Sequence, residues 1–316
     1  MIYAFGGYGC NNVGDEAIFE GLLRTTTRAV TQIYVNVPEV PNAVWYADLL
    51  SGKEKFSSAA TELRIGGGGI AHCLGAVEDY VRMAKIAKEQ GLIVTVQGVG
   101  LEGCTPEIAP ALSELLSLAS IITVRSAKSK QIAKELGFVS LQCKDFAYSI
   151  PTKESSLIRH GVGVSLSGVA DKDLPIYVER IRVLLRHFNV TFIPHTRPYV
   201  SYDDNDVVLG HKIWSLLGGW IDKSLKDFHV VDFDANPGYA LLRYASVKAV
   251  YTGRYHGCIF SEMTNTPVIG IGGGLKLKSF FDERTSDLIT YIPGSTPEAQ
   301  VLEELNAWCE ELKCST

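Results

Sequence analysis

The sequence predicts an α/β fold made of two Rossmann-like domains that face each other across a cleft. Short apolar runs alternate with helix-length amphipathic segments along almost the whole chain, which is typical of βαβ units and parallel sheets. A polar stretch without periodicity, 151–159, interrupts this alternation near the middle and predicts a linker. The predicted domains are therefore 1–152 and 160–316. Glycine and charged residues follow several apolar runs, at the strand ends where such sheets bind ligands.

The elements of the N-terminal domain are predicted from the apolar runs and the amphipathic segments between them. Strands are expected at 2–5, 33–37, 62–65, 93–97 and 121–124. Helices are expected from near residue 15 onward and at 80–90, 108–118 and 128–136.

The same alternation restarts in the C-terminal domain. Strands are expected at 161–166, 190–193, 229–231, 248–252 and 268–271. Helices are expected at 176–186, 213–225, 239–243, 258–263 and 297–312. For the last of these helices, packing back on the N-terminal domain is one expected arrangement.

The composition excludes several classes of protein. The formal net charge of the 316 residues is -5 and no block of Lys or Arg occurs, so nucleic acid is not expected as a partner. No apolar run is long enough for a transmembrane helix, and the first residues lack the pattern of a signal peptide. The seven cysteines are scattered, which predicts neither a zinc site nor a disulfide framework. We expect a cytoplasmic protein with reduced thiols and no bound metal.

Two glycine-rich loops follow strands of the N-terminal domain. In the first, Gly7 and Gly9 fit a dinucleotide fingerprint, but Asn12 occupies the third glycine position and no acidic residue directly follows the second strand, so NAD binding is rejected. Either the glycines form a turn before a helix with acidic residues in its first turn, or they form a cradle for a polar ligand, with Asn12 and Asp15 facing the cleft. The four glycines at 66–69 predict close approach of the backbone to another segment or to a ligand.

Three further polar segments end strands or follow them. Arg125 is either a surface residue or an anion contact, since guanidinium binds carboxylate and phosphate in a two-pronged manner. His195 is either a loop histidine bonded within the protein or a ligand contact. The stretch 203–206 is expected to be a solvated turn rather than a metal loop, because it lacks the glycine and the distant glutamate of a calcium loop.

The segment Gly253-Arg254-Tyr255-His256-Gly257 lies between a buried strand and a helix. In an extended segment, residues two apart share a face, so Arg254 and His256 are expected to point together into the cleft. A helix N-terminus favours anions, and Arg254 adds a positive charge. The alternative is that carboxylates elsewhere satisfy both side chains. Lys276 or Lys278, which follow the next strand, could reach the same anion.

Several motifs in this order resemble the polysaccharide pyruvyl transferase family: NNVGDEAI, RIGGGGI, TVQGVG, Arg125 with a serine four residues on, KDFAYSI, FIPHT with Asp206 downstream, and GRYHG followed by TPVIGIGGGLKLK. Members have a two-domain fold similar to GT-B glycosyltransferases. They transfer an enolpyruvyl-derived group from phosphoenolpyruvate to two hydroxyls of a sugar, which makes a cyclic pyruvate ketal. The chain departs from the family pattern at Ser126, at 101–103 and at 272–274.

The resemblance implies roles for the residues singled out above. His256 is assigned as general acid and base, and Arg125, Arg254 and Lys276 as contacts of the donor phosphoenolpyruvate. The assigned acceptor contacts are Asn12, Asp15, Gly67, Gly68, Gly69 and His195. No cofactor other than this donor is expected.

The acceptor is expected to be a sugar of a polysaccharide precursor, linked either to a lipid or to a nucleotide. A lipid-linked acceptor would add peripheral contact with the inner face of the membrane. One alternative function is a glycosyltransferase of similar fold, with Glu262 contacting the ribose of a nucleotide sugar. The other is a sugar-binding protein without catalysis.

Overall fold

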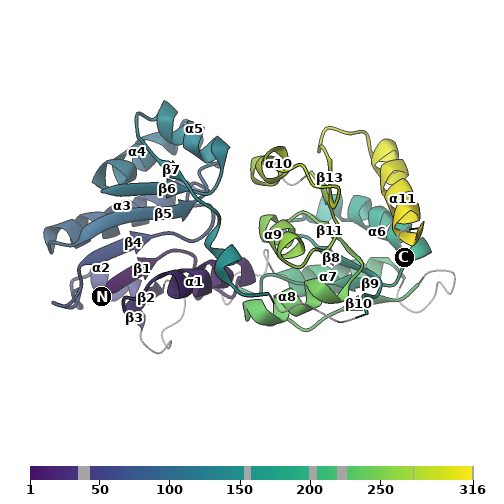
Figure 1. Ribbon diagram of the computed structural model, residues 1–316, viewed down its shortest axis with the longest axis horizontal. Coiled ribbons are helices and arrows are strands. Elements are labelled where there is room, and N and C mark those ends of the chain that lie inside the picture. Colours follow the sequence, from purple (N-terminus) through teal and green to yellow (C-terminus); the bar gives the residue numbers. More distant parts are fainter. Residues whose placement is uncertain (35–42, 153–157, 199–204, 219–225, 273, 315–316) are drawn as a thin grey trace. The chain divides into compact units, whose positions relative to one another are not determined.

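The computed structural model describes residues 1–34, 43–152, 158–198, 205–218, 226–272 and 274–314 (Figure 1). The chain divides into two compact units, Met1–Pro151 and Thr152–Thr316. Each unit contains one sheet of parallel strands joined largely through helices, which confirms the predicted α/β class. Most of the predicted linker, 153–157, lies outside the described residues.

The first unit alternates strands and helices as its sequence predicts. Its strands are β1 (Ile2–Phe5), β2 (Val30–Tyr34), β3 (Ala43–Trp45), β4 (Glu62–Ile65), β5 (Ile93–Val99), β6 (Ile121–Val124) and β7 (Leu141–Gln142). Its helices are α1 (Val13–Thr25), α2 (Tyr46–Leu50), α3 (Leu74–Glu89), α4 (Ala109–Leu118), α5 (Ala127–Glu135) and the short 3₁₀ helix η1 (Phe146–Ser149).

The second unit repeats the pattern. Its strands are β8 (Val162–Ser165), β9 (Val190–Phe192), β10 (Phe228–Val230), β11 (Ala249–Thr252), β12 (Val268–Ile271) and β13 (Ile289–Ile292). Its helices are η2 (Asp171–Asp173), α6 (Leu174–His187), α7 (Asp206–Leu216), α8 (Pro237–Ser246), α9 (Tyr255–Met263), α10 (Gly274–Asp282) and α11 (Glu298–Cys314).

The strand order gives each sheet a topological switch point, where the chain changes the direction in which it adds strands. The orders are β3-β2-β1-β4-β5-β6-β7 and β10-β9-β8-β11-β12-β13, so each unit starts in the doubly wound Rossmann order 3-2-1-4-5-6. In the first sheet the switch point lies between β1 and β4, which pair in parallel with Phe5 opposite Ile65. In the second it lies between β8 and β11, with Ser165 opposite Thr252. Ligands of such sheets bind at the carboxyl ends of these strands.

The central strands are buried along their whole length. Every residue of β1, β8, β11 and β12 is buried, because helices cover both faces of a doubly wound parallel sheet. This explains why these strands are continuous apolar runs in the sequence.

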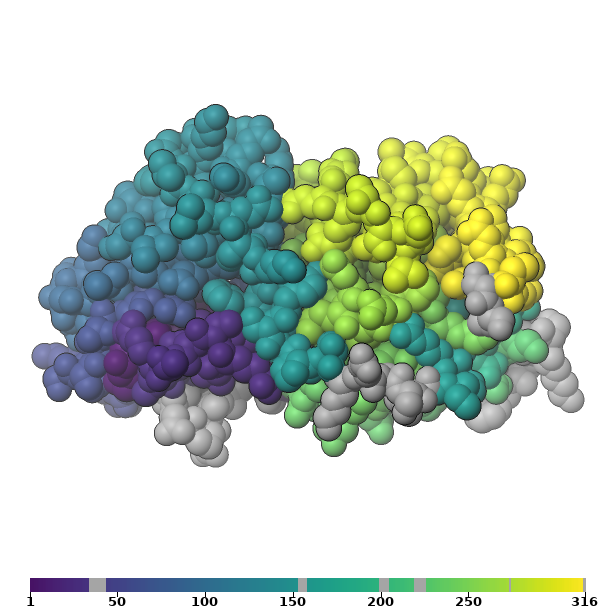
Figure 2. Space-filling model, viewed as in Figure 1, coloured from purple at the N-terminus to yellow at the C-terminus, as the bar shows by residue number. Residues whose placement is uncertain are grey.

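The last helix, α11, packs in the second unit. Val301, Leu305 and Trp308 lie in the same apolar core as α6, and Arg180 of α6 is 2.5 Å (Nη2 to Oε2) from Glu298. These apolar residues contribute to the core of their own unit, and packing of the helix back on the N-terminal domain stays a prediction. The outer side of α11, shown in yellow, forms part of that unit's surface (Figure 2).

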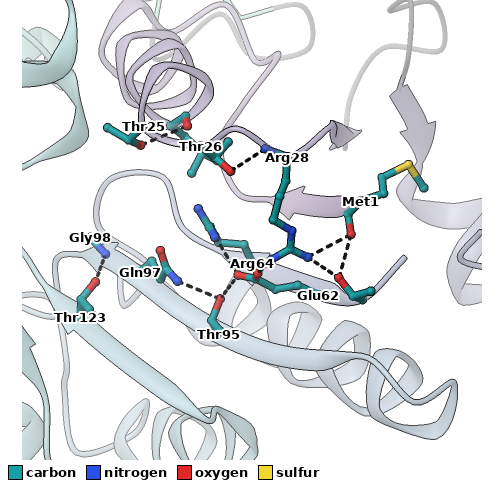
Figure 3. Close-up of polar contacts among 12 residues, drawn as sticks. Met1, Thr25, Thr26, Arg28, Glu62, Arg64, Thr95, Gln97, Gly98 and Thr123 are labelled. Atoms are coloured by element: carbon teal, nitrogen blue, oxygen red, sulfur yellow. Dashed lines mark hydrogen bonds and ion pairs between the residues drawn. The ribbon is translucent and has the colours of Figure 1, made fainter. Parts of the chain in front are cut away.

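A buried carboxylate ties together the amino ends of strands in the first unit (Figure 3). Glu62, the first residue of β4, accepts hydrogen bonds from Arg28 Nη1 at 2.6 Å, Arg64 Nε at 2.9 Å and Thr95 Oγ1 at 2.9 Å. Burial alone would raise the pKa of Glu62, but the bonds from Arg64, Thr95 and Arg28 hold it below the ordinary value. Glu62 begins β4 and Arg28 precedes β2, so these bonds stabilise the sheet near the amino ends of its strands, opposite the glycine loops.

Candidate functional site

Arg254 bridges the two strands at the switch point of the second unit. It directly follows β11, and its backbone N–H donates to Thr252 Oγ1 at 3.0 Å. Its side-chain Nε donates to the carbonyl oxygen of Leu166, just beyond β8, at 3.1 Å. The guanidinium is therefore fixed at the carboxyl ends of both strands, the position that the sequence predicts for it.

Asp206 orients this guanidinium. One carboxylate oxygen forms an ion pair with Arg254 Nη2. The other accepts the backbone N–H groups of His195 at 2.8 Å and Thr196 at 3.1 Å. Asp206 is 2% exposed, so the expectation of a solvated turn is wrong for this residue, while 203 and 204 lie outside the described residues. A buried carboxylate with this many donors is a strong positional constraint.

His195 lies in the same cluster and is almost fully buried. Its Nε2 is 2.7 Å from the hydroxyl of Tyr244, and its ring packs against Phe260. Burial, followed by the positive charges of Arg254 and His256, holds the pKa of His195 well below its ordinary value. His195 is therefore neutral near pH 7 and is bonded within the protein. Its predicted contact with the acceptor stays a prediction.

His256 lies in the first turn of a helix, which differs from the extended segment that the sequence predicted. Arg254 is the N-cap residue, with extended backbone angles, and α9 starts at Tyr255. The two side chains still belong to one cluster, since Asp206 binds both Arg254 and the His195 amide, and the rings of His195 and His256 both lie against Phe260. Gly257 permits this tight helix start, because a Cβ there would collide with Thr252 Oγ1. A partly exposed imidazole at a helix N-terminus beside a fixed guanidinium is suited to proton transfer on an anionic ligand.

The two late lysines differ in their surroundings. Lys278 is exposed and its Nζ is 2.5 Å from Asp282 Oδ2, one turn away on α10. Lys276 lies in the first turn of this helix, which follows β12, the strand next to β11. Of the two, Lys276 therefore stays the candidate for a ligand contact.

The glycine loops of the first unit meet at its switch point. A Cβ on Gly6 would collide with the carbonyl oxygen of Gly66, and Gly67 has a φ of +89°. The glycine run therefore serves the close approach of two backbone segments, one of the two explanations left open by the sequence. The predicted ligand contacts of Gly67, Gly68 and Gly69 stay predictions.

Polar side chains from α1 surround these loops. Asn12 caps the helix and accepts the Gly14 N–H at 3.0 Å. Asp15 reaches toward both loops, since a Cβ on Gly7 would lie 3.0 Å from its Oδ2 and a Cβ on Gly68 would lie 2.7 Å from its Oδ1. Both residues lie where the sequence places a ligand cradle, and their acceptor contact stays a prediction.

Glu16 was not predicted as a site residue. Its Oε1 accepts the N–H of Gly9 at 2.8 Å, and the Cys10 amide also bonds to this carboxyl group. Burial, together with the neighbouring Asp15 carboxylate, raises the pKa of Glu16 to about 7 in spite of these bonds. The sequence places Glu16 among the acidic residues in the first turn of α1. Its bond to Gly9, seven residues earlier, could not be predicted, because it depends on how the chain turns between β1 and α1.

We expect the raised pKa of Glu16 to make stability depend on pH. The folded chain holds this proton between the unfolded pKa of about 4.5 and a folded pKa of about 7, so stability contributed here falls as pH rises through that window. At pH 8, Glu16→Gln should therefore have a free energy of unfolding about 2 kcal/mol greater than wild type, and a higher urea midpoint. At pH 5 the two proteins should unfold alike. Unfolding of this unit is followed by Trp45 fluorescence. The pH dependence of stability that comes from His195 is the same in wild type and variant, so it cancels in the comparison. Equal midpoints at pH 8 would contradict the expectation.

Arg125 is buried in the first unit. Its Nη1 lies 3.2 Å from Asp145 Oδ2, and the two side chains are 2% and 1% exposed. Nearby, Ser126 Oγ donates to Glu102 Oε1 at 2.5 Å. Asp145 also accepts the Ala147 N–H at 3.0 Å. Asp145 and Glu102 were not predicted as site residues, because their contacts with Arg125 and Ser126 join segments that are 20 and 24 residues apart in the sequence. The predicted donor contact of Arg125 stays a prediction.

Two other classes of site are absent from the residues that the structure describes. Among those residues, no group of three or more His, Cys, Asp or Glu side chains is arranged to hold a metal ion. No helix in the same part of the chain is long and apolar enough to cross a membrane.

The fold is GT-B-like, as the similarity to solved structures shows. The UDP-GlcNAc 2-epimerase of Methanocaldococcus jannaschii, solved with UDP-GlcNAc and UDP, aligns with a TM-score of 0.61 at 10% identity over 97% of this chain and 91% of that one. The Neisseria meningitidis UDP-GlcNAc 2-epimerase bound to UDP-GlcNAc has a TM-score of 0.58 at 10% identity, over 98% and 91%. The Staphylococcus aureus MnaA–UDP complex has a TM-score of 0.60 at 9% identity, over 98% and 87%.

Among proteins with this fold, the family of the chain is identified from its sequence. The polysaccharide pyruvyl transferase family model matches residues 12–274, and the chain belongs to this family. The match includes the first glycine loop from Asn12 onward, Arg125, Asp206 and the Arg254–His256 segment. A comparison with curated proteins gave no match.

Proposed function

We propose that the protein transfers a pyruvyl group from phosphoenolpyruvate to two hydroxyls of a sugar, forming a cyclic ketal and releasing phosphate. Membership of the polysaccharide pyruvyl transferase family supports the general reaction. The observation that carries the proposal is the cluster at the switch point of the second unit, where Asp206 holds Arg254 beside His256 at the start of α9.

The donor fits the charge of this cluster. Phosphoenolpyruvate carries a carboxylate and a phosphate, and both groups bind best to fixed cations and helix N-termini. Arg254 is the proposed fixed cation, and Lys276 is a second one at the adjacent strand end. The ion pair of Arg254 with Asp206 orients the guanidinium.

The acceptor is proposed to contact the first unit. Asn12, Asp15 and the glycines at 67–69 lie at its switch point, where neutral hydroxyls can bond to backbone groups and to a carboxylate. His195 lies in the second unit beside Arg254, so its proposed role is contact with the part of the acceptor that reacts.

The protons balance over the reaction: two leave the sugar hydroxyls, one adds to the donor and one departs with phosphate. A proton adds to the methylene carbon of the donor, and a sugar hydroxyl forms a bond to the adjacent carbon and loses its own proton. The bond from that carbon to the phosphate oxygen then breaks, and the second hydroxyl attacks as its proton leaves with phosphate. His256 is proposed to give the first proton and to accept one from a hydroxyl. Arg254 would stabilise the negative charge on the departing phosphate.

The test mixes the purified protein with phosphoenolpyruvate and a panel of sugars, and follows phosphate release together with product mass. We expect acceptor-dependent release and a product heavier by one pyruvate ketal. His256→Ala should lower turnover at least about 100-fold while the protein stays folded. His211→Ala, an exposed position on α7, is the matched control. Wild-type-like turnover in His256→Ala would remove His256 from the mechanism.

A nucleotide-sugar glycosyltransferase is the second candidate, favoured by the similarity to epimerase structures that contain UDP-GlcNAc. Thermal shifts distinguish the two candidates. Stabilisation by UDP-GlcNAc without any response to phosphoenolpyruvate would overturn the proposed donor. If both ligands are silent and no sugar is modified, the remaining function is sugar binding without catalysis.

A further inference from the structure

The β1–α1 loop has the backbone shape of an anion site. It follows the first strand at the switch point, where doubly wound sheets place the pyrophosphate of a dinucleotide. Gly9 has a left-handed φ of +75°, and the amides of Gly9 and Cys10 both point to one acceptor. Successive N–H groups of this kind form a nest that binds phosphates in many proteins.

In this chain a side chain of the protein itself, Glu16, occupies the nest. The acceptor of both amides is the carboxyl group of Glu16, 2.8 Å from the Gly9 nitrogen. Asn12 takes the Gly14 amide in the first turn of α1, and the Asp15 carboxylate lies against Gly7 and Gly68. A phosphate entering the loop would have to displace one carboxylate and lie beside another, which like-charge repulsion opposes.

We propose that Glu16 occupies the place of a ligand phosphate in this loop, so that the first unit recognises uncharged hydroxyls and excludes anionic groups. The assignment of the hydroxyls to the acceptor sugar rests on the proposed function. It follows that any phosphate that links the acceptor to a carrier binds outside this loop. Glu16 is a positioning residue, because it acts on the ligand through the Gly9 and Cys10 amides.

The proposal is tested by titrating inorganic phosphate into isotope-labelled protein and following the Gly9 and Cys10 amide resonances by NMR. In wild type we expect no saturable shift of either amide. In Glu16→Ala, which empties the nest, we expect both amides to shift saturably. Glu20→Gln, one turn further along α1 and paired with Arg24, is the matched control and should behave as wild type.

Each outcome decides the matter. Saturable shifts of both amides in wild type would overturn the proposal, and so would a folded Glu16→Ala whose two amides ignore phosphate. If Glu16→Ala fails to fold, the wild-type titration decides alone. Silent Gly9 and Cys10 amides, in a sample where phosphate does shift resonances near Arg254, support the proposal. This readout uses neither phosphoenolpyruvate nor a sugar, so it stays valid if the proposed reaction fails.

Kinetics provide a second readout once an acceptor is known. Glu16→Ala should raise the KM for the acceptor about tenfold or more, with the KM for phosphoenolpyruvate unchanged. Glu16→Gln retains an oxygen that can accept the Gly9 amide and should recover most of the loss. A purely structural role would lower the amount of folded enzyme without this selective change in the acceptor KM, and that result would count against the proposal.

Discussion

Asp206→Ala is expected to lower the free energy of unfolding of the second unit by about 3–5 kcal/mol. The substitution leaves the guanidinium of Arg254, whose side chain is 11% exposed, without the carboxylate that holds it. It also removes the acceptor of the His195 and Thr196 amides. Urea unfolding followed by the tryptophans of this unit measures the effect.

A matched pair of variants divides this effect into its two parts. Asp206→Asn keeps one oxygen for the His195 and Thr196 amides but presents no charge to Arg254. We expect a smaller loss of stability, about 1–2 kcal/mol, together with a raised KM for phosphoenolpyruvate, because Arg254 is no longer held in place. Asp171→Asn removes an exposed ion pair with Lys212 and should cost at most about 1 kcal/mol.

The opposite pattern would be informative. If Asp206→Ala is as stable as Asp171→Asn, the buried carboxylate does not organise the switch point. If Asp206→Asn has the stability expected of it and an unchanged KM for phosphoenolpyruvate, Arg254 is not a donor contact and the proposed donor site is wrong.

Much of the fold could be predicted because its central strands are continuous apolar runs. The strands 2–5, 62–65 and 121–124 were predicted with the observed bounds. The strands β3, β7 and β13 were missed: β3 and β7 have three and two residues, and β13 is partly exposed. The helix α10 was also missed, because a glycine run precedes it in the sequence; it begins at Gly274 with a φ of +67°.

The candidate site could be predicted only as far as strand ends determine it. Arg254 and His256 follow a buried strand, so their position at the sheet edge was predictable. The hydrogen-bond partners were not. Asp206 lies in a run of acidic residues that indicates solvent, and its burial depends on Arg254, 48 residues further along the chain. Glu16 could be placed on its helix, but the bond to Gly9 depends on how the loop turns.

A double-mutant cycle on Arg125 and Asp145 should show a large stabilising coupling in the first unit. The two side chains are almost fully buried and lie 3.2 Å apart, so Arg125→Met or Asp145→Asn alone removes one member of this buried ion pair. Each single variant is expected to cost about 3–4 kcal/mol. The double variant should cost less than the sum by about 2–3 kcal/mol. Asn at 145 can still accept the Ala147 N–H, so the helix cap is not the quantity measured.

Unfolding followed by Trp45 gives the four free energies, and Arg82→Met, from an exposed pair with Asp79, is the control with an expected cost below about 1 kcal/mol. Additive effects of the two substitutions would contradict the coupling.

The same variants decide whether Arg125 also contacts the donor. A guanidinium that is 2% exposed and directed at Asp145 is held by the protein, so we expect the folded double variant to bind phosphoenolpyruvate with a KM within about threefold of wild type. A rise of tenfold or more in that KM, with normal stability of the second unit, would show that Arg125 serves the donor as the family resemblance implies. An unchanged KM leaves Arg254 and Lys276 as the cations of the proposed donor site. In that case the buried Arg125–Asp145 pair serves the stability of the first unit.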